Sequence, residues 1–144
     1  MKQIVLYLML ALYVQVKAQT VLTWADLKNG ISFEKKASND TYPSFYKATF
    51  SSKLADLEGQ KIQLTGFFIV LDGPLPVYML SVNPMASCFF CGNGGPESIA
   101  GLSFTKKPDF TMDDVVTITG ILRLNGKDPT RCYYEIEKAE AYGF

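Results

Sequence analysis

The sequence predicts a mainly β protein, a small five-stranded Greek-key barrel of the oligonucleotide/oligosaccharide-binding (OB) type with a short N-terminal helical and loop extension. Residues 61–71 and 115–124 alternate apolar and polar side chains with a period of two, as half-buried strands do. Each segment has a glycine at its middle, Gly66 in "LTGFF" and Gly120 in "ITGIL", where the long strands of a small barrel bend. Three shorter strand-like segments complete the set; another small sandwich or an incomplete barrel stays open.

The first 18 residues have the layout of a secretory signal peptide. Lys2 precedes an unbroken apolar run over residues 4–14, and Val16 and Ala18 stand at minus-three and minus-one of a plausible cleavage site. The run is well short of the roughly 20 residues that span a bilayer, so we expect removal rather than a retained anchor. The expected organisation is a signal peptide over residues 1–18 and a single OB-like domain over residues 19–144. The product would be periplasmic or secreted, without a transmembrane segment.

The extension before the barrel contains a short helix. The stretch "TWADLKNG" (residues 23–30) predicts a helix that Thr23 caps and Gly30 ends. Trp24 is expected to plug one end of the barrel. The segments that follow are an edge strand over residues 31–36, a loop over residues 37–46, and a strand end with a helical turn over residues 48–59.

The barrel strands follow in order, separated by turn signals. They are predicted over residues 61–71, 77–82, 101–105, 115–124 and 132–142. Aspartate–glycine and asparagine–glycine pairs supply the turns after the two long strands. In the last strand we expect Tyr134 and Ile136 to point into the barrel.

Composition narrows the possible functions. The chain of 144 residues has 14 basic and 14 acidic residues, and removal of residues 1–18 would leave a net charge of −2. This balance gives no electrostatic attraction to nucleic acid. The chain has no histidine, which excludes histidine-based catalytic triads and removes the commonest metal ligand. We assign no catalytic residue, and the sequence favours a binding protein over an enzyme.

The stretch "SCFFCGNGGPES" (residues 87–98) contains Cys88 and Cys91, and the chain has one further cysteine after the signal peptide, Cys132. In an exported protein a disulfide is the default state of paired cysteines. A Cys88–Cys91 bond would close a very small ring and would stabilise the fold by less than roughly 3 kcal/mol. A bond from either loop cysteine to Cys132 would close a longer loop and leave one thiol free.

Two other interpretations give these cysteines a chemical role. A redox pair normally opens a helix whose dipole stabilises the thiolate, but "GNGG" follows Cys91. A metal site fits the spacing better, since Cys-x-x-Cys followed by glycine, here Gly92, forms one half of many zinc sites. Cys132 is then the candidate third ligand and Glu97 the nearest carboxylate. Alternatively, Cys88 and Cys91 alone form an open site for Cu(I) or Zn(II).

Residues 78–102, "YMLSVNPMASCFFCGNGGPESIAGL", and residues 120–125, "GILRLN", resemble a family of small exported Bacteroidetes proteins of unknown function. That family has a Cys-Phe-Phe-Cys-Gly-x-x-Gly-Pro-Glu block and is similar to a periplasmic family whose corresponding loop has a Cys-x-His motif. The resemblance implies export and a barrel-like domain, and it brings no catalytic activity. It implies functional positions at Cys88, Cys91, Gly92, Gly95, Pro96 and Glu97. Because histidine cannot form a disulfide, the change from Cys/Cys to Cys/His favours a metal.

We therefore expect an exported binding or accessory protein in which Cys88 and Cys91 hold Zn(II) or Cu(I). It would pass the ion to, or sense it for, an unknown envelope protein or transporter component. The alternatives are a structural or protein–protein interaction module whose Cys-x-x-Cys is a disulfide and, third, a thiol–disulfide oxidoreductase. Phe89 and Phe90 could form an exposed docking tip, although such a pair commonly buries at least one ring under its own loop.

Overall fold

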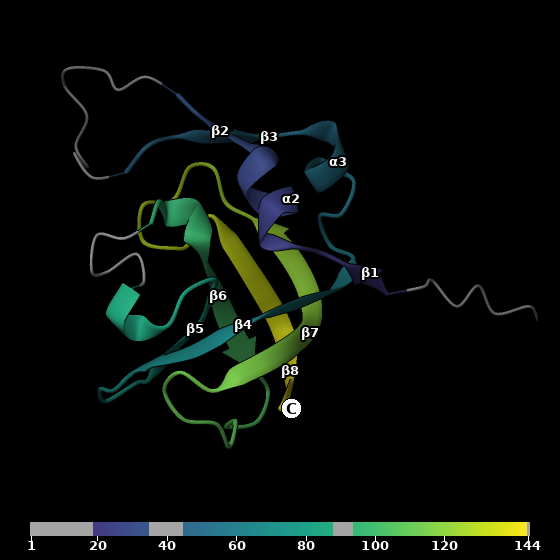
Figure 1. Cartoon of the computed structure of the whole chain (residues 1–144). Helices are drawn as coiled ribbons and strands as arrows, with labels where there is room; N and C mark the ends of the chain where they lie inside the picture. Colours follow the sequence, from purple (N-terminus) through teal and green to yellow (C-terminus); the bar gives the residue numbers. More distant parts are fainter. Residues whose placement is uncertain (1–18, 35–44, 88–93, 144) are drawn as a thin grey trace, which may run out of the picture.

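The computed structural model of the chain describes residues 19–34, 45–87 and 94–143 (Figure 1). The predicted signal peptide, most of the predicted loop over residues 37–46, and both cysteines of the Cys-x-x-Cys motif lie outside the described residues. The elements in chain order are β1 (Thr20–Val21), α2 (Trp24–Asn29), β2 (Ile31–Phe33), β3 (Ala48–Phe50), α3 (Ser52–Ala55), β4 (Lys61–Leu71), β5 (Val77–Ser81), the 3-10 helices η1 (Met85–Ser87) and η3 (Pro96–Ser98), β6 (Ile99–Phe104), β7 (Val115–Leu124) and β8 (Tyr134–Gly143).

Strands β4 to β8 form a closed barrel. β4 pairs antiparallel with β5, β5 antiparallel with β6, and β6 parallel with β8. β8 pairs antiparallel with β7, and β7 pairs antiparallel with β4, which closes the ring. Numbered from β4, the strands meet in the order 1-2-3-5-4 and return to 1, the Greek-key arrangement of a small OB-type barrel. The predicted fold class is confirmed.

The two mid-strand glycines lie where the sheet changes direction. β4 pairs with β7 from Lys61 to Phe67 and with β5 from Phe67 to Leu71, so the strand changes neighbours next to Gly66. A Cβ atom on Gly66 would lie 2.5 Å from the backbone oxygen of Ser81, which is too close for any larger residue. The glycine of "ITGIL" occupies a register shift between β7 and β8. Both positions are therefore required by the bent strands, as the sequence predicts.

The barrel interior is filled by side chains that alternate along the strands. Ile62, Leu64 and Phe68 of β4 are buried, and Tyr134 and Ile136 of β8 are buried with them, as predicted. The period-two pattern therefore identifies the core face correctly.

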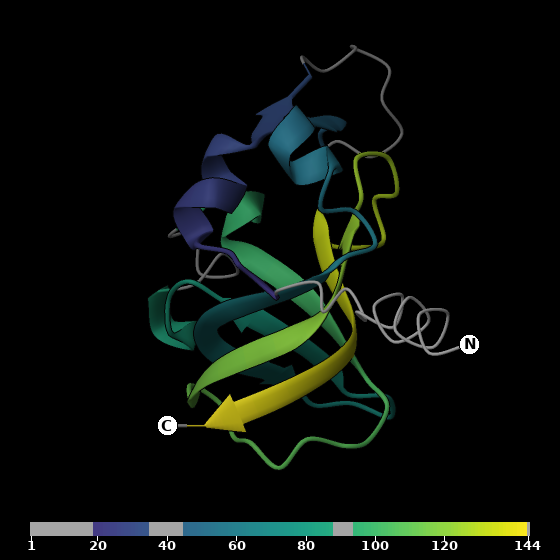
Figure 2. The ribbon, with the colours of Figure 1, turned by 90° about the vertical axis from the view of Figure 1, so that its right-hand side faces the viewer.

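The N-terminal extension lies over one end of the barrel, where α2, α3 and the small sheet of β2 and β3 sit together (Figures 1 and 2). Thr23 caps α2 through a capping box, as predicted. Leu27 of α2 is fully buried, and its carbonyl accepts a hydrogen bond of 2.9 Å from the Tyr134 hydroxyl. Trp24 is half-buried, and its indole N–H donates to the Thr65 carbonyl at 2.8 Å. Trp24 is packed against the barrel core, in which Leu27 of the same helix is buried.

Two strands begin at other residues than predicted. β6 begins at Ile99 instead of residue 101, because Ile99 and Ala100 still pair with β5. β8 begins at Tyr134, so Cys132 lies before the strand. Its backbone N–H bonds to a side chain and not to a neighbouring strand. Cys132 therefore belongs to the turn between β7 and β8.

Candidate functional site

The loop between β5 and β6, residues 82–98, is held at its ends. The backbone N–H of Val82 donates to the Ser98 carbonyl at 3.1 Å, which joins the two sides of the loop at its neck. The backbone N–H of Met85, in η1, donates to the Asp113 carboxylate at 2.7 Å. Both cysteines of the Cys-x-x-Cys motif lie outside the described residues, and the structure describes the residues on either side of them.

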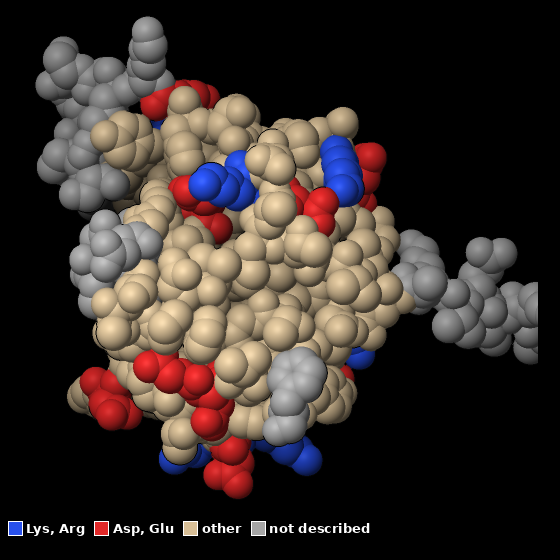
Figure 3. Space-filling view, in the orientation of Figure 1, with Lys and Arg blue, Asp and Glu red and all other residues tan. Residues whose placement is uncertain are grey.

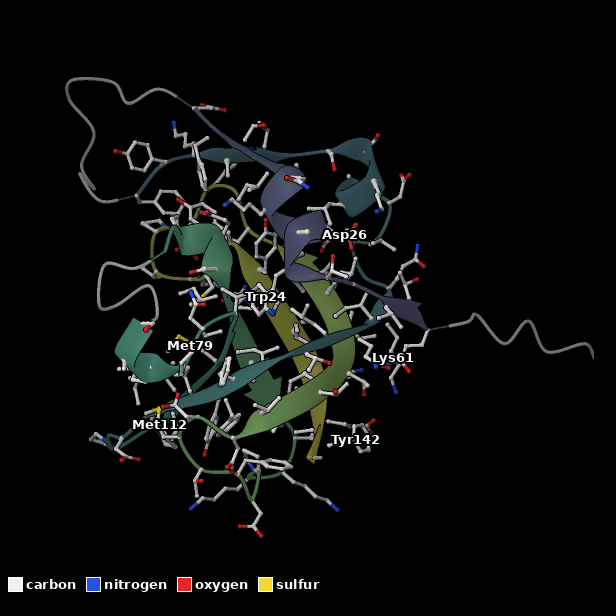
Figure 4. All side chains as sticks on the ribbon, in the orientation of Figure 1. Trp24, Asp26, Lys61, Met79, Met112 and Tyr142 are labelled. Carbon is white, nitrogen blue, oxygen red and sulfur yellow. The ribbon has the colours of Figure 1, made fainter. Side chains whose placement is uncertain are left out.

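A second hydrophobic cluster lies on the outer surface of the barrel. It consists of Ile69, Met79 and Ile99, with Leu71, Met85 and Cys132 packed against it, and we call these six residues the outer cluster. Ile69 follows the inward-facing Phe68, so its side chain points out of the barrel, yet its exposed fraction is 0%. Met79, its partner on β5, is also buried and lies beside η1 (Figure 4). Met85 of the loop and Cys132 of the turn before β8 pack against these outward-facing strand residues.

Cys132 is the one predicted thiol ligand that the described residues contain, and it has a free thiol. Its backbone N–H donates to Oε1 of Glu135 at 3.0 Å, and a backbone hydrogen bond from Gly101 reaches the thiol. Burial, and to a smaller extent the nearby Glu135 charge, raise the pKa of Cys132 to about 11. At neutral pH the side chain is therefore a protonated thiol of low reactivity.

Glu135 is held against the outside of β6. Its side chain is 12% exposed, and its Oε2 lies 3.7 Å from Nη2 of Arg131. A Cβ atom on Gly101, its paired residue on β6, would lie 2.6 Å from that same Oε2. The glycine therefore leaves the space that the carboxyl group occupies. Burial raises the pKa of Glu135, and the positive charge of Arg131 opposes this shift.

Glu97, the predicted carboxylate ligand, lies on η3, which Pro96 begins. Its carboxyl group folds back over Gly95, where a Cβ atom would overlap it. Glu97 lines a pocket of about 400 Å³ between α2 and the neck of the loop. Burial first, and then the charge of Glu97, raise the pKa of Tyr134. Glu97 therefore faces α2 and the end of the barrel.

Within residues 19–34, 45–87 and 94–143, no group of three or more cysteine, aspartate or glutamate side chains is placed to hold a metal ion. What these residues do bring together is Cys132 and Glu135, a pairing that the sequence reasoning missed. The sequence feature that could have indicated this pair is the Cys-x-x-Glu spacing of "CYYE" (residues 132–135). A turn at this spacing returns the carboxylate to the residue that bears the thiol.

Charged side chains in the view of Figure 3 lie mostly toward the two ends of the barrel, and the middle of this face is largely uncharged. The ion pairs of Arg123 are exposed: its side chain contacts Glu58 at 3.5 Å and Glu137 at 3.0 Å. Exposed pairs of this kind add little to stability. In the part of the chain that the structure describes, no helix has the length and apolar character needed to cross a membrane.

No family model matches the chain, and no curated protein matches it significantly. The fold is similar to the crystal structure of a DUF3299 family protein (PA4066) from Pseudomonas aeruginosa PAO1. The TM-score is 0.55 at 14% sequence identity, and the match covers 88% of this chain and 98% of that chain. At this identity the similarity establishes a shared fold and leaves the function to be argued from the site.

Proposed function

We propose that the chain is an exported binding or accessory protein that holds a soft metal ion, Zn(II) or Cu(I), with the thiolates of Cys88, Cys91 and Cys132. It would deliver the ion to, or report its presence to, a protein of the cell envelope. The Cys-x-x-Cys-Gly motif supports this proposal. So does the absence of histidine, because it leaves the thiolates and thioethers as the soft donors of the chain.

The observation that carries the proposal is the position of Cys132 on the outer cluster. The residue is remote from the Cys-x-x-Cys motif in sequence, yet it packs on the same cluster as Met85, which precedes Cys88 by three positions. Three residues of extended chain span at most about 10 Å. This short separation of Cys88 from Met85 supports a site that the motif shares with Cys132.

Metal binding would have to remove the proton from Cys132. With a pKa of about 11, deprotonation at pH 7 costs roughly 5 kcal/mol. Structural zinc binds cysteine sites of small peptides with an apparent free energy of roughly 10–16 kcal/mol at pH 7, so the ion can supply this cost. Until an ion arrives, the protonated thiol resists oxidation, which suits a free cysteine outside the cytoplasm.

Thiol titration and elemental analysis of the protein purified from the cell envelope test the proposal. We expect a stoichiometric soft metal, thiols that a chelator unmasks without reductant, and loss of the metal in Cys88→Ser and Cys91→Ser. A metal-free protein in which two cysteines titrate only after reduction would instead assign the motif to a structural disulfide. Insulin reduction that is lost in Cys88→Ser would assign it to a thiol–disulfide oxidoreductase.

A further inference from the structure

We infer that the pocket between α2 and the neck of the loop binds a small zwitterion, an α-amino acid or a short peptide with an apolar side chain. This inference goes beyond the proposed function, because it uses none of the cysteines and no metal ion. Every residue that lines the pocket belongs to the described part of the chain. We call it the α2 pocket, and its main lining residues are Trp24, Ala25, Lys28, Val82, Asn83 and Glu97.

The α2 pocket has the size and the lining of a small-molecule site. Its volume of about 400 Å³ falls within the range of about 300–1,000 Å³ that such sites occupy. Trp24, Ala25 and Val82 supply an apolar wall, and the remaining three side chains supply an ammonium group, an amide and a carboxylate. An apolar wall with a few polar groups is the usual composition of a ligand pocket.

Trp24 is a fixed part of the wall. Its indole N–H donates to the Thr65 carbonyl at 2.8 Å, and its Cζ2 atom packs over Gly66, where a Cβ atom would lie 3.3 Å away. The side chain leaves the start of α2 and lies over the barrel strands (Figure 4). Because these contacts already hold the ring, a ligand that packs against it causes little further loss of side-chain entropy.

Two opposite charges border the α2 pocket. Lys28 lies in the last turn of α2, and Glu97 lies on η3 with its carboxyl group folded back over Gly95. The hydroxyl of Ser98 donates to the Gly95 carbonyl at 2.7 Å and so fixes the turn that carries Glu97. In the described part of the chain, Lys28 and Glu97 form no ion pair with each other or with another residue. Each charge is therefore available to a ligand group of the opposite sign.

A zwitterion matches both charges of the α2 pocket at once. Its carboxylate would pair with Lys28, its ammonium group would pair with Glu97, and its apolar side chain would pack against Trp24. A ligand with a single charge would place that charge near a like charge of the pocket, which is unfavourable. An uncharged apolar ligand would remove water from both charges without replacing it.

Fluorescence titration tests the inference, because Trp24 is the one tryptophan of the chain and therefore reports directly on the α2 pocket. The probes are L-leucine and leucyl-leucine, with N-acetyl-leucine, which lacks the ammonium group, and leucinamide, which lacks the carboxylate. The exported form of the protein is titrated with a chelator present, so that no metal ion contributes. We expect a saturable change with the zwitterions and binding of the two analogues that is weaker by about 3- to 10-fold.

Two substitutions assign the charges. Lys28→Gln should abolish the preference for leucine over leucinamide and keep the preference over N-acetyl-leucine, and Glu97→Gln should do the reverse. Lys127→Gln and Glu34→Gln are the controls, because both residues are exposed and lie outside the α2 pocket. Ala25→Leu narrows the pocket without changing its charge, at an exposed helix position that tolerates leucine, and should weaken the binding of every probe.

The outcomes are distinct from those of the metal experiments. Failure of every zwitterion to saturate the fluorescence change would overturn the inference, and so would equal affinities for leucine and both analogues. Preferences that persist unchanged in Lys28→Gln and Glu97→Gln would also overturn it, because other residues would then recognise the charges. Tighter binding of leucine or of leucyl-leucine supports the inference in either case and tells a free amino acid from a peptide. A protein that binds zwitterions and no metal would retain this inference and lose the proposed function.

Discussion

Replacing Ile69 with alanine is expected to destabilise the fold strongly, although the residue lies on the outside of the barrel. Its exposed fraction is 0%, and the substitution removes three carbon atoms from the outer cluster. At about 0.8 kcal/mol per carbon the transfer cost is about 2.4 kcal/mol, and the cavity raises the total to about 3–4 kcal/mol. An uncovered strand position that faces solvent would lose at most about 0.5 kcal/mol.

Equilibrium urea unfolding measures this difference. Ile121→Ala on β7 is the matched control, because Ile121 faces out of the barrel next to the buried Leu122 and is partly exposed. We expect a clearly larger fall in the urea midpoint for Ile69→Ala, with an unchanged slope. Alkylation of Cys132 should also be faster in Ile69→Ala, because the packing under the thiol is loosened. Equal, small losses at both positions would refute the conclusion that the loop and the turn before β8 cover this face.

Three further predictions concern single side chains: Cys132, Tyr134 and Thr23. In a variant without Cys88 and Cys91, the alkylation rate of Cys132 should rise about tenfold per pH unit up to about pH 11, because burial keeps the thiol protonated; a plateau near pH 9 would contradict the burial. Tyr134→Phe removes the donor to the buried Leu27 carbonyl and should cost about 1–3 kcal/mol in urea unfolding, whereas an unchanged midpoint would show that the hydrogen bond adds nothing. Thr23→Ala should cost about 1 kcal/mol through loss of the cap of α2, and Thr23→Ser should retain it.

The barrel was predictable because its strands show their geometry directly in the sequence. A half-buried strand must alternate, and β4 and β7 do so over most of their length. A strand that changes neighbours needs room at the bend, and Gly66 provides it against the Ser81 backbone. These requirements are local, so each can be recognised in the sequence within a few residues of the position that it affects.

The outer cluster depends on contacts between distant segments, and so does the position of the thiol–carboxyl pair against β6. Ile69 stands in the apolar run "FFIVL", and nothing in that run indicates that a loop returns to cover its outward face. Glu135 depends on the register of β6 against β8, which sets it opposite Gly101. Glu97 was predicted because it is close in sequence to Cys91, whereas the carboxylate that contacts Cys132 is Glu135, three positions after it.

The covered face also bears on what kind of ligand this barrel can take. In OB-type barrels the outer face of the second and third strands, with the adjoining loops, binds oligonucleotides or oligosaccharides. Here β5 and β6 hold those positions, and Met79 and Ile99 on them are buried within the outer cluster. The chain thus covers with its own residues part of the surface that the fold commonly uses for polymers. Under the proposed function, the barrel supports Met85 of the loop and Cys132 on one outer face.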